Sequence, residues 1–111
     1  MTLNEYQKAA NRTSGQLTNH GHIENGVMGL CGESGECIDL VKKATFQGHP
    51  LDREKLIDEL SDVLWYAAEL ATGLGVSLDE VAQHNIDKLK ARYPDGFDSK
   101  KSIHRKEYEN G

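Results

Sequence analysis

Two stretches of the sequence, GESGECIDL at residues 32–40 and DELSDVLWY at residues 58–66, decide the fold. Each places acidic residues along a pattern of apolar residues, where neutral polar residues would have served a helix equally well. Residues three apart lie beside each other on a helix surface, so each stretch forms one acidic edge. If the two helices pack antiparallel, their acidic edges can face each other. The acidic pairs are Glu33 with Glu36 in the first stretch and Glu59 with Asp62 in the second.

The apolar residues in and around these stretches repeat every three or four positions, which is the period of an amphipathic helix. The pattern predicts one long helix over residues 23–45 and a second over residues 53–72. Between them, Gly48 and Pro50 interrupt the helical pattern, and Asp52 is suited to cap the start of the next helix. The two acidic edges therefore belong to a predicted helical hairpin.

Two shorter helices are marked by capping boxes, in which a hydroxyl residue precedes a glutamate by three positions. Thr2 opens a helix over residues 3–12, and Ser77 opens a helix that ends near Arg92. Residues 13–22 are rich in Gly, Ser, Thr and Asn and are predicted to form a loop. We find no strand pattern. The sequence therefore predicts an all-α fold, an antiparallel four-helix bundle.

The C-terminal end differs from the rest in composition. YPDGF at residues 93–97 has the composition of a turn. The residues that follow are polar and have no helical stripe, which is typical of a loosely held segment. We therefore predict one helical domain over residues 1–97 and an irregular, polar C-terminal tail over residues 98–111.

The length, composition and net charge of the chain exclude some classes of protein. The chain has 111 residues and a formal net charge of −5 at pH 7, which argues against a protein that wraps nucleic acid or binds an anionic membrane surface. No apolar run approaches the roughly 18 to 20 residues of a membrane span, and the start lacks the apolar core of a signal peptide. We therefore expect a cytoplasmic protein without nucleic-acid or membrane partners.

The small size also bears on assembly. Only 37% of the residues are apolar, and four short helices leave apolar side chains without cover. Trp65 falls opposite the apolar stripe of its helix, so we interpret it as a contact with a second copy rather than as a platform for a base. We expect a homodimer, with pairing of dimers into a tetramer as the alternative.

Facing acidic edges repel each other, more strongly as burial removes water. A divalent cation is the natural partner, because Mg²⁺ prefers oxygen ligands and is often held by a few carboxylates together with substrate phosphates. Ordinary solvated helix faces are the alternative explanation of either pair alone. Two pairs at core edges, on the two most apolar helices, favour the metal site.

GESGE followed by DELSDVLWY resembles the Glu-x-x-Glu and Glu-x-x-Asp motifs of the MazG-like all-α nucleoside triphosphate pyrophosphohydrolases. GHPLDREKL and NIDKLKARYPDGF are also similar to that family, so the resemblance covers about residues 4–97. It implies an enzyme that uses Mg²⁺, or Mn²⁺ as a substitute, to hydrolyse nucleoside triphosphates to monophosphate and pyrophosphate. Gly32 stands where the family pattern has a first Glu, which leaves the number of metal ions open. The residues implied as catalytic metal ligands are Glu33, Glu36, Glu59 and Asp62.

The last predicted helix carries a polar strip, with Asn85, Lys88 and Arg92 at spacings of three and four. Such donors suit a polyphosphate, although a solvated basic edge has the same pattern. The resemblance implies that Asn85 and Lys88 contact the nucleotide, and Arg92 extends their strip. Lys43 lies on nearly the same face as Glu36, where it can meet phosphate or neutralise the carboxylates.

Two other metal or nucleotide folds are disfavoured. A ferritin-like di-iron bundle requires the motif Glu-x-x-His twice, and no Glu of this sequence has a His three positions later. The triphosphate-binding loop GxxxxGK is also absent from the sequence. The remaining alternative is a non-catalytic helical module that binds nucleotide or a basic protein partner, which Gly32 keeps open. The patterns do not distinguish normal from damaged nucleotides.

Overall fold

A computed structural model describes residues 1–104 of the chain, and these residues form helices and connecting turns without a named strand. The predicted all-α class and the four predicted helices are confirmed. The structure comprises two units, residues 1–78 and the residues from 79 onward. The helices are α1 (Leu3–Asn11), α2 (Asn19–Phe46), α3 (Arg53–Leu74), α4 (Leu78–Arg92) and α5 (Ser99–Ile103).

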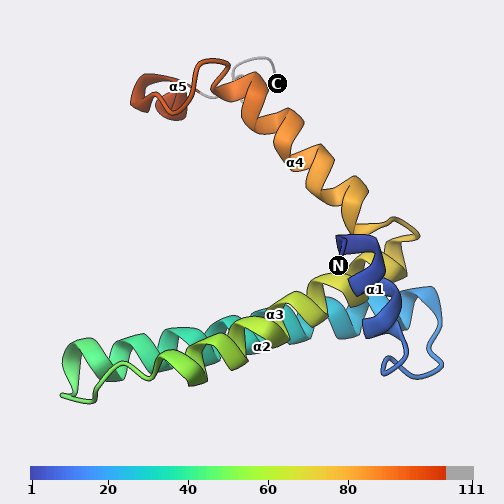
Figure 1. Cartoon of the computed structure of the whole chain (residues 1–111), viewed down its shortest axis with the longest axis horizontal. Helices are drawn as coiled ribbons and strands as arrows, with labels where there is room; N and C mark the ends of the chain where they lie inside the picture. Colours follow the sequence, from blue (N-terminus) through green and yellow to red (C-terminus); the bar gives the residue numbers. More distant parts are fainter. Residues whose placement is uncertain (105–111) are drawn as a thin grey trace. The chain divides into compact units, whose positions relative to one another are not determined.

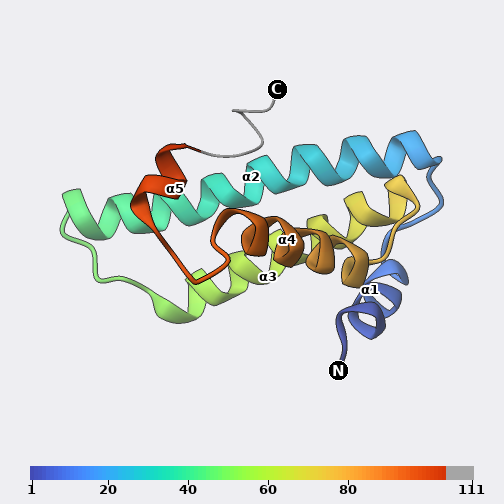
Figure 2. The same ribbon diagram turned by 90° about the horizontal axis from the view of Figure 1, so that it is seen from above.

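The helices α2 and α3 form the predicted antiparallel hairpin and lie side by side along their length (Figures 1 and 2). The second helix of the pair begins as expected, because the Asp52 side chain accepts a hydrogen bond from the backbone N–H of Lys55 at 3.0 Å. The first begins four residues earlier than predicted. Its cap is Thr18, whose hydroxyl accepts from the N–H of Gly21 at 3.0 Å, so residues 19–22 are helical rather than part of the loop.

Glycines allow the two helices to approach closely. Gly26 lies against the backbone of Leu70, where an added Cβ would be 2.8 Å from the nearest atoms. Gly29 lies against the ring of Tyr66, where a Cβ would be only 2.1 Å away. Each glycine costs a helix about 1 kcal/mol relative to alanine. At these two positions, the cost is offset by a contact that no larger residue could make.

The small core forms where α1 packs against α3. Gln7 of α1 organises this contact, because its side-chain carbonyl accepts from the N–H of Leu78 at 2.7 Å and its amide donates to the carbonyl of Val76 at 3.1 Å. Gly75, with φ of +74°, ends α3 and turns the chain toward these contacts. The buried apolar residues are Ala68, Ala71 and Leu78, with Tyr6, Ala10 and Val76 packed against them.

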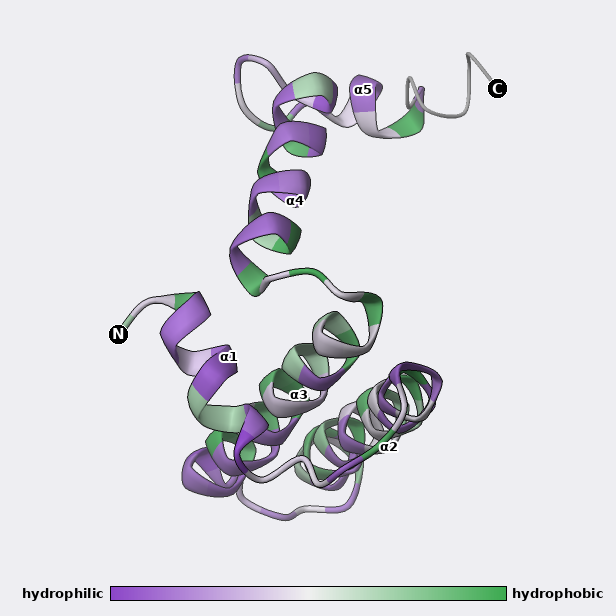
Figure 3. Cartoon of the chain, turned by 90° about the vertical axis from the view of Figure 1, so that its right-hand side faces the viewer, coloured by the Kyte–Doolittle hydropathy of each residue, from purple (hydrophilic) through white to green (hydrophobic). Residues whose placement is uncertain are grey.

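The hairpin also leaves large apolar side chains exposed, and Figure 3 shows apolar residues along both of its helices. Six of them, each between 41% and 66% exposed, lie between about a third and a half of a turn from the contact between the helices. Because the helices are antiparallel, the two stripes are displaced toward the same side of the hairpin. We call this set the apolar face: Val27, Ile38 and Val41 of α2 with Ile57, Leu60 and Leu64 of α3.

The second unit contains α4, the predicted turn and α5. In the turn, the N–H of Gly96 donates to the carbonyl of Tyr93 at 3.1 Å, and the rings of Tyr93 and Phe97 lie 5.4 Å apart. The segment predicted as an irregular tail contains the short helix α5, because the Asp98 side chain caps it by accepting from the N–H of Lys100 at 2.8 Å. The rest of the predicted tail, residues 105–111, lies outside the described residues.

None of the helices in residues 1–104 combines the length and the apolar character that a membrane span requires.

Candidate active site

Three of the four predicted metal ligands meet across the hairpin. Glu33 of α2 and Glu59 and Asp62 of α3 each place a carboxylate oxygen within 4.8 Å of the others. We call these three residues the acidic cluster. Glu33 and Glu59 are half-buried, whereas Asp62 is exposed, so the cluster is open to solvent. Hard oxygen donors in this number suit Mg²⁺ or Mn²⁺, which are commonly held by one to three carboxylates with water and phosphate completing the shell.

The electrostatics of the acidic cluster also fit a cation. The pKa of Glu33 is raised from 4.5 to about 7, mainly by a hydrogen bond with Glu59 and then by partial desolvation. The charges of Glu59, Asp62 and Glu36 supply the rest of this shift. The carboxylates are therefore held closer together than their mutual repulsion favours. A divalent cation would relieve that repulsion by displacing the shared proton.

Glu36, the fourth predicted ligand, is exposed and stands outside the group of three. It lies one helical turn beyond Glu33, and its charge contributes to the raised pKa of Glu33. The structure therefore places Glu36 beside the acidic cluster, where it can approach a bound ion or a water molecule next to it.

A pocket of about 300 Å³ adjoins the acidic cluster and is lined by Glu33, Asp62, Trp65 and Tyr66. The two aromatic rings pack edge to face with centroids 5.0 Å apart. The indole N–H of Trp65 donates to the hydroxyl of Thr13 at 2.9 Å, which ties the loop after α1 to this wall of the pocket. Trp65, predicted as an interface residue, is thus half-buried beside the carboxylates.

A second polar cluster, which the sequence reasoning missed, lies buried between the loop after α1 and the two long helices. Glu69 is 3% exposed and accepts from the hydroxyl of Ser14 at 2.7 Å, the amide of Asn25 at 2.8 Å and Nδ1 of His22 at 2.6 Å. Burial tends to raise the pKa of Glu69, but these hydrogen bonds and the charge of His22 outweigh it and lower the pKa below 4.5. Glu69 is therefore held as a carboxylate.

The signal for this buried cluster was present in the sequence. The loop predicted over residues 13–22 includes His22, but the cap at Thr18 makes this residue part of α2. Once helical, His22 lies four residues before Gly26, on the side that contacts α3. Recognising the cap would have predicted a buried histidine that needs an acidic partner.

The predicted phosphate-binding residues fall in two places. Lys43 of α2 forms an ion pair with Asp39 at 2.9 Å, and the hydrogen bond and charge of Asp39 raise the pKa of Lys43. Asn85 and Lys88 are exposed on α4, and Arg92 is half-buried near its end. Asn85, Lys88 and Arg92 belong to the second unit, whereas the acidic cluster belongs to the first.

Comparison with known proteins identifies the class of this chain. Residues 22–97 match the family model of the MazG nucleotide pyrophosphohydrolase domain, and the chain belongs to the MazG family. It is also similar to the "Gene 37 protein" of Mycobacterium phage L5, with 37% identity over 101 residues, covering 83% of this chain and 89% of that protein. No solved structure gives a significant match. The matched range contains the whole acidic cluster and the pocket beside it.

Proposed function

We propose that this chain is a divalent-metal-dependent enzyme that hydrolyses nucleoside triphosphates to nucleoside monophosphate and pyrophosphate. The observation that carries the proposal is the acidic cluster, with three carboxylate oxygens from two helices within 4.8 Å of one another. Membership of the MazG nucleotide pyrophosphohydrolase family supports the same reaction class.

Each part of the site has a role in this proposal. Glu33, Glu59 and Asp62 hold Mg²⁺, or Mn²⁺ in its place, and Glu36 completes the set at its edge. When bound, the ion neutralises phosphate charge and makes a water molecule more acidic. Glu36, exposed beside the cluster, is available to accept a proton from the attacking water.

The pocket beside the acidic cluster provides space for the nucleoside. Its volume of about 300 Å³ is at the lower end of the range for small-molecule sites. Trp65 and Tyr66 offer aromatic surface next to the carboxylates, which suits a base whose phosphates reach the metal. We assign phosphate contacts to Lys43 and to the strip of Asn85, Lys88 and Arg92.

We also propose that the protein is a homodimer in which the apolar face is covered by a second copy. The six side chains of this face present on the order of 500 Å², more than half of the roughly 800 Å² that each partner buries in a stable interface. The buried apolar core of the described residues is limited to Ala68, Ala71 and Leu78, so covering the face would add substantially to the stability of the fold. A tetramer of paired dimers is the alternative assembly.

The test is a panel of normal and modified nucleoside triphosphates incubated with Mg²⁺ or Mn²⁺, with both products identified. We expect monophosphate and pyrophosphate in equal amounts, and a loss of at least a hundredfold in kcat/KM for Glu59→Gln, because a neutral amide is a weaker metal ligand. Glu54→Gln is the matched control, since Glu54 is an exposed acidic residue of the same helix outside the cluster. Tight nucleotide binding without turnover would instead support the non-catalytic module.

A further inference from the structure

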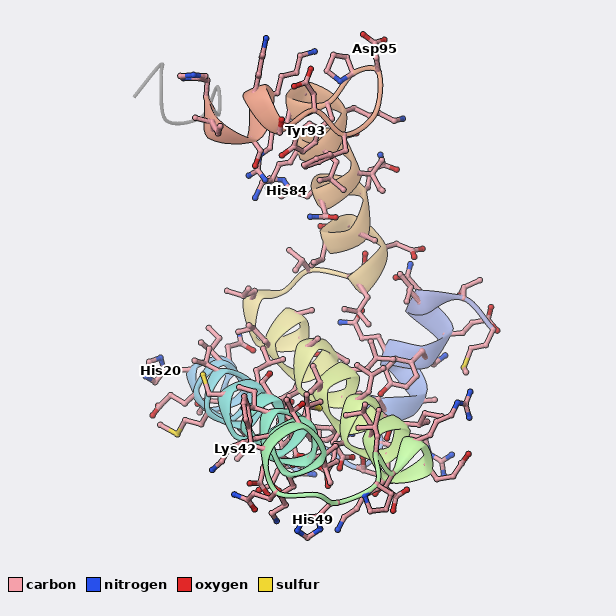
Figure 4. The ribbon with its side chains drawn as sticks, turned by 90° about the vertical axis from the view of Figure 1, so that its left-hand side faces the viewer. His20, Lys42, His49, His84, Tyr93 and Asp95 are labelled. Carbon is pink, nitrogen blue, oxygen red and sulfur yellow. The ribbon has the colours of Figure 1, made fainter. Side chains whose placement is uncertain are left out.

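The tip of the α2–α3 hairpin contains a second pocket, of about 370 Å³. The loop that forms it is held to the end of α2, because the N–H groups of Gln47 and His49 both donate to the carbonyl of Lys43, at 3.0 and 3.2 Å. Gly48, with φ of +73°, makes this tight turn possible. Figure 4 labels His49 in the loop. The residues lining the pocket are Leu40, Lys43, His49, Pro50, Asp52 and Lys55.

This pocket lies where positive charge from both helices converges. Lys43 is paired with Asp39 at 2.9 Å. The hydrogen bond from Lys43 lowers the pKa of Asp39, and the charges of Lys43, Lys42 and Lys55 lower it further, together outweighing the effect of burial. Lys55 is therefore close enough to act on a carboxylate of the opposite helix. A negative group is stabilised at this place by lysines from α2 and α3.

The pocket and the acidic cluster lie on one strip of the hairpin. Lys55 precedes Glu59 by four residues and Asp62 by seven, so these three side chains follow one another along the same side of α3. At 1.5 Å per residue, the strip from Lys55 to Asp62 is about 10 Å long. On α2, Lys43 follows Glu36 by seven residues along the corresponding side. An elongated anion held by a cation at one end would reach the lysines at the other.

We propose that Lys43, His49 and Lys55 form a binding site for the diphosphate part of the substrate and for the pyrophosphate product. This proposal rests on the proposed function. It adds that the lysine end of the strip binds the two outer phosphates of the substrate, while the acidic end holds the metal. Lysine ammonium groups bind phosphate as point charges, and an exposed imidazole supplies one further N–H donor. Asp39 competes with the incoming phosphate for Lys43, which keeps product binding weak enough for release.

Isothermal titration of the full chain with inorganic pyrophosphate, with and without Mg²⁺, tests this site directly. Each lost charge-assisted hydrogen bond is expected to weaken binding about tenfold, so Lys43→Met and Lys55→Met should each have this effect. Asp39→Asn should strengthen binding several-fold, because it removes the competing charge and keeps an acceptor for Lys43. Nucleoside monophosphate, which lacks the two outer phosphates, should bind all these variants like the original chain.

Lys8→Gln is the matched control, because it removes the same charge from an exposed position of α1 outside the pocket. Far-ultraviolet circular dichroism and thermal melting of each variant establish that it is folded. Unchanged pyrophosphate affinity in folded Lys43→Met and Lys55→Met, or an equal loss in Lys8→Gln, would overturn the site even if the chain hydrolyses triphosphates. Specific loss of pyrophosphate binding in a chain without hydrolytic activity would uphold the site and refute the proposed function.

Discussion

Glu69 shows how a single buried carboxylate can hold a loop in place. It accepts hydrogen bonds from Ser14 in the loop after α1 and from Asn25 and His22 in α2. The same loop supplies Thr13, which holds the indole of Trp65 beside the acidic cluster. The geometry of the pocket wall therefore depends on a residue that does not line it.

We predict that Glu69→Gln destabilises the fold by about 1 to 3 kcal/mol at pH 7, because one of the buried donors loses its acceptor. The folded-state pKa of Glu69 lies below 4.5, so the ionised carboxylate stabilises the fold at pH values above the pKa that Glu69 has in the unfolded chain. This contribution is lost as pH falls through the folded pKa. Urea denaturation between pH 7 and pH 3 should show that the difference in the free energy of unfolding between the original chain and Glu69→Gln becomes smaller as the pH falls.

Glu54→Gln, at an exposed position of the same helix, should leave the free energy of unfolding within about 0.5 kcal/mol of the original. A cost of Glu69→Gln that does not change with pH would contradict the role of the ionised carboxylate.

At the scale of single residues, the sequence predicted the four candidate carboxylates but not which of them meet across the hairpin. Spacing alone put Glu33 and Glu36 side by side at one edge of α2. The structure turns Glu33 toward α3 and leaves Glu36 outside the group of three. The reason is that the helices approach closely at Gly26 and Gly29, which lie on the Glu33 side of the apolar stripe of α2, so the contact is rotated toward Glu33. A glycine has no hydrophobicity to reveal such a contact.

At the scale of the helices, the interior glycines of α2 have two different roles. Gly26 and Gly29 lie in the contact with α3, whereas a Cβ at Gly32 or Gly35 would meet nothing within 4 Å. The helix bounds followed from caps and periodicity, apart from the start of α2, where the polar composition of residues 19–22 concealed the cap at Thr18. Composition is a weaker guide there than the one hydrogen bond that begins the helix.

We predict that Gly29→Ala destabilises the fold by about 1 to 3 kcal/mol, because its Cβ would overlap the ring of Tyr66 and force it to shift. Gly35→Ala makes the same chemical change in open space and should stabilise the fold by about 0.5 to 1 kcal/mol. Urea denaturation of the two variants side by side gives the comparison. Equal effects of the same sign would show that helix propensity, not the contact with Tyr66, determines the outcome.

At the scale of the whole molecule, the proposed homodimer depends on the apolar face. We predict that a double substitution, Ile38→Glu with Leu60→Glu, converts the proposed dimer to monomers, because each copy would bury two charges in the proposed interface. These side chains are 66% and 61% exposed in the single chain, so the substitutions disturb little of the monomer's own packing. Analytical ultracentrifugation across a concentration series measures the change in mass.

Met28→Glu is the control for this prediction, since Met28 is 68% exposed on α2 but outside the apolar face. We expect it to remain dimeric. A chain that is monomeric before substitution, or a double variant that stays dimeric, would contradict the assigned interface. The sequence predicted that apolar side chains would need cover, Trp65 among them, but a helical wheel cannot show that the loop after α1 also contacts Trp65.

Gly26 and Gly29 have no side chains to hold the two helices apart, and this bears on the size of the ion that the acidic cluster would select. They set the separation of the two backbones, and hence the gap that oxygens from opposite sides must bridge. Mg²⁺ requires oxygens at about 2.0 to 2.1 Å, while Ca²⁺ accepts about 2.3 to 2.6 Å in looser arrangements. If the acidic cluster holds a divalent cation as proposed, a hairpin spread by even a methyl group would favour the larger cation, so two glycines that bind nothing themselves would set the metal preference.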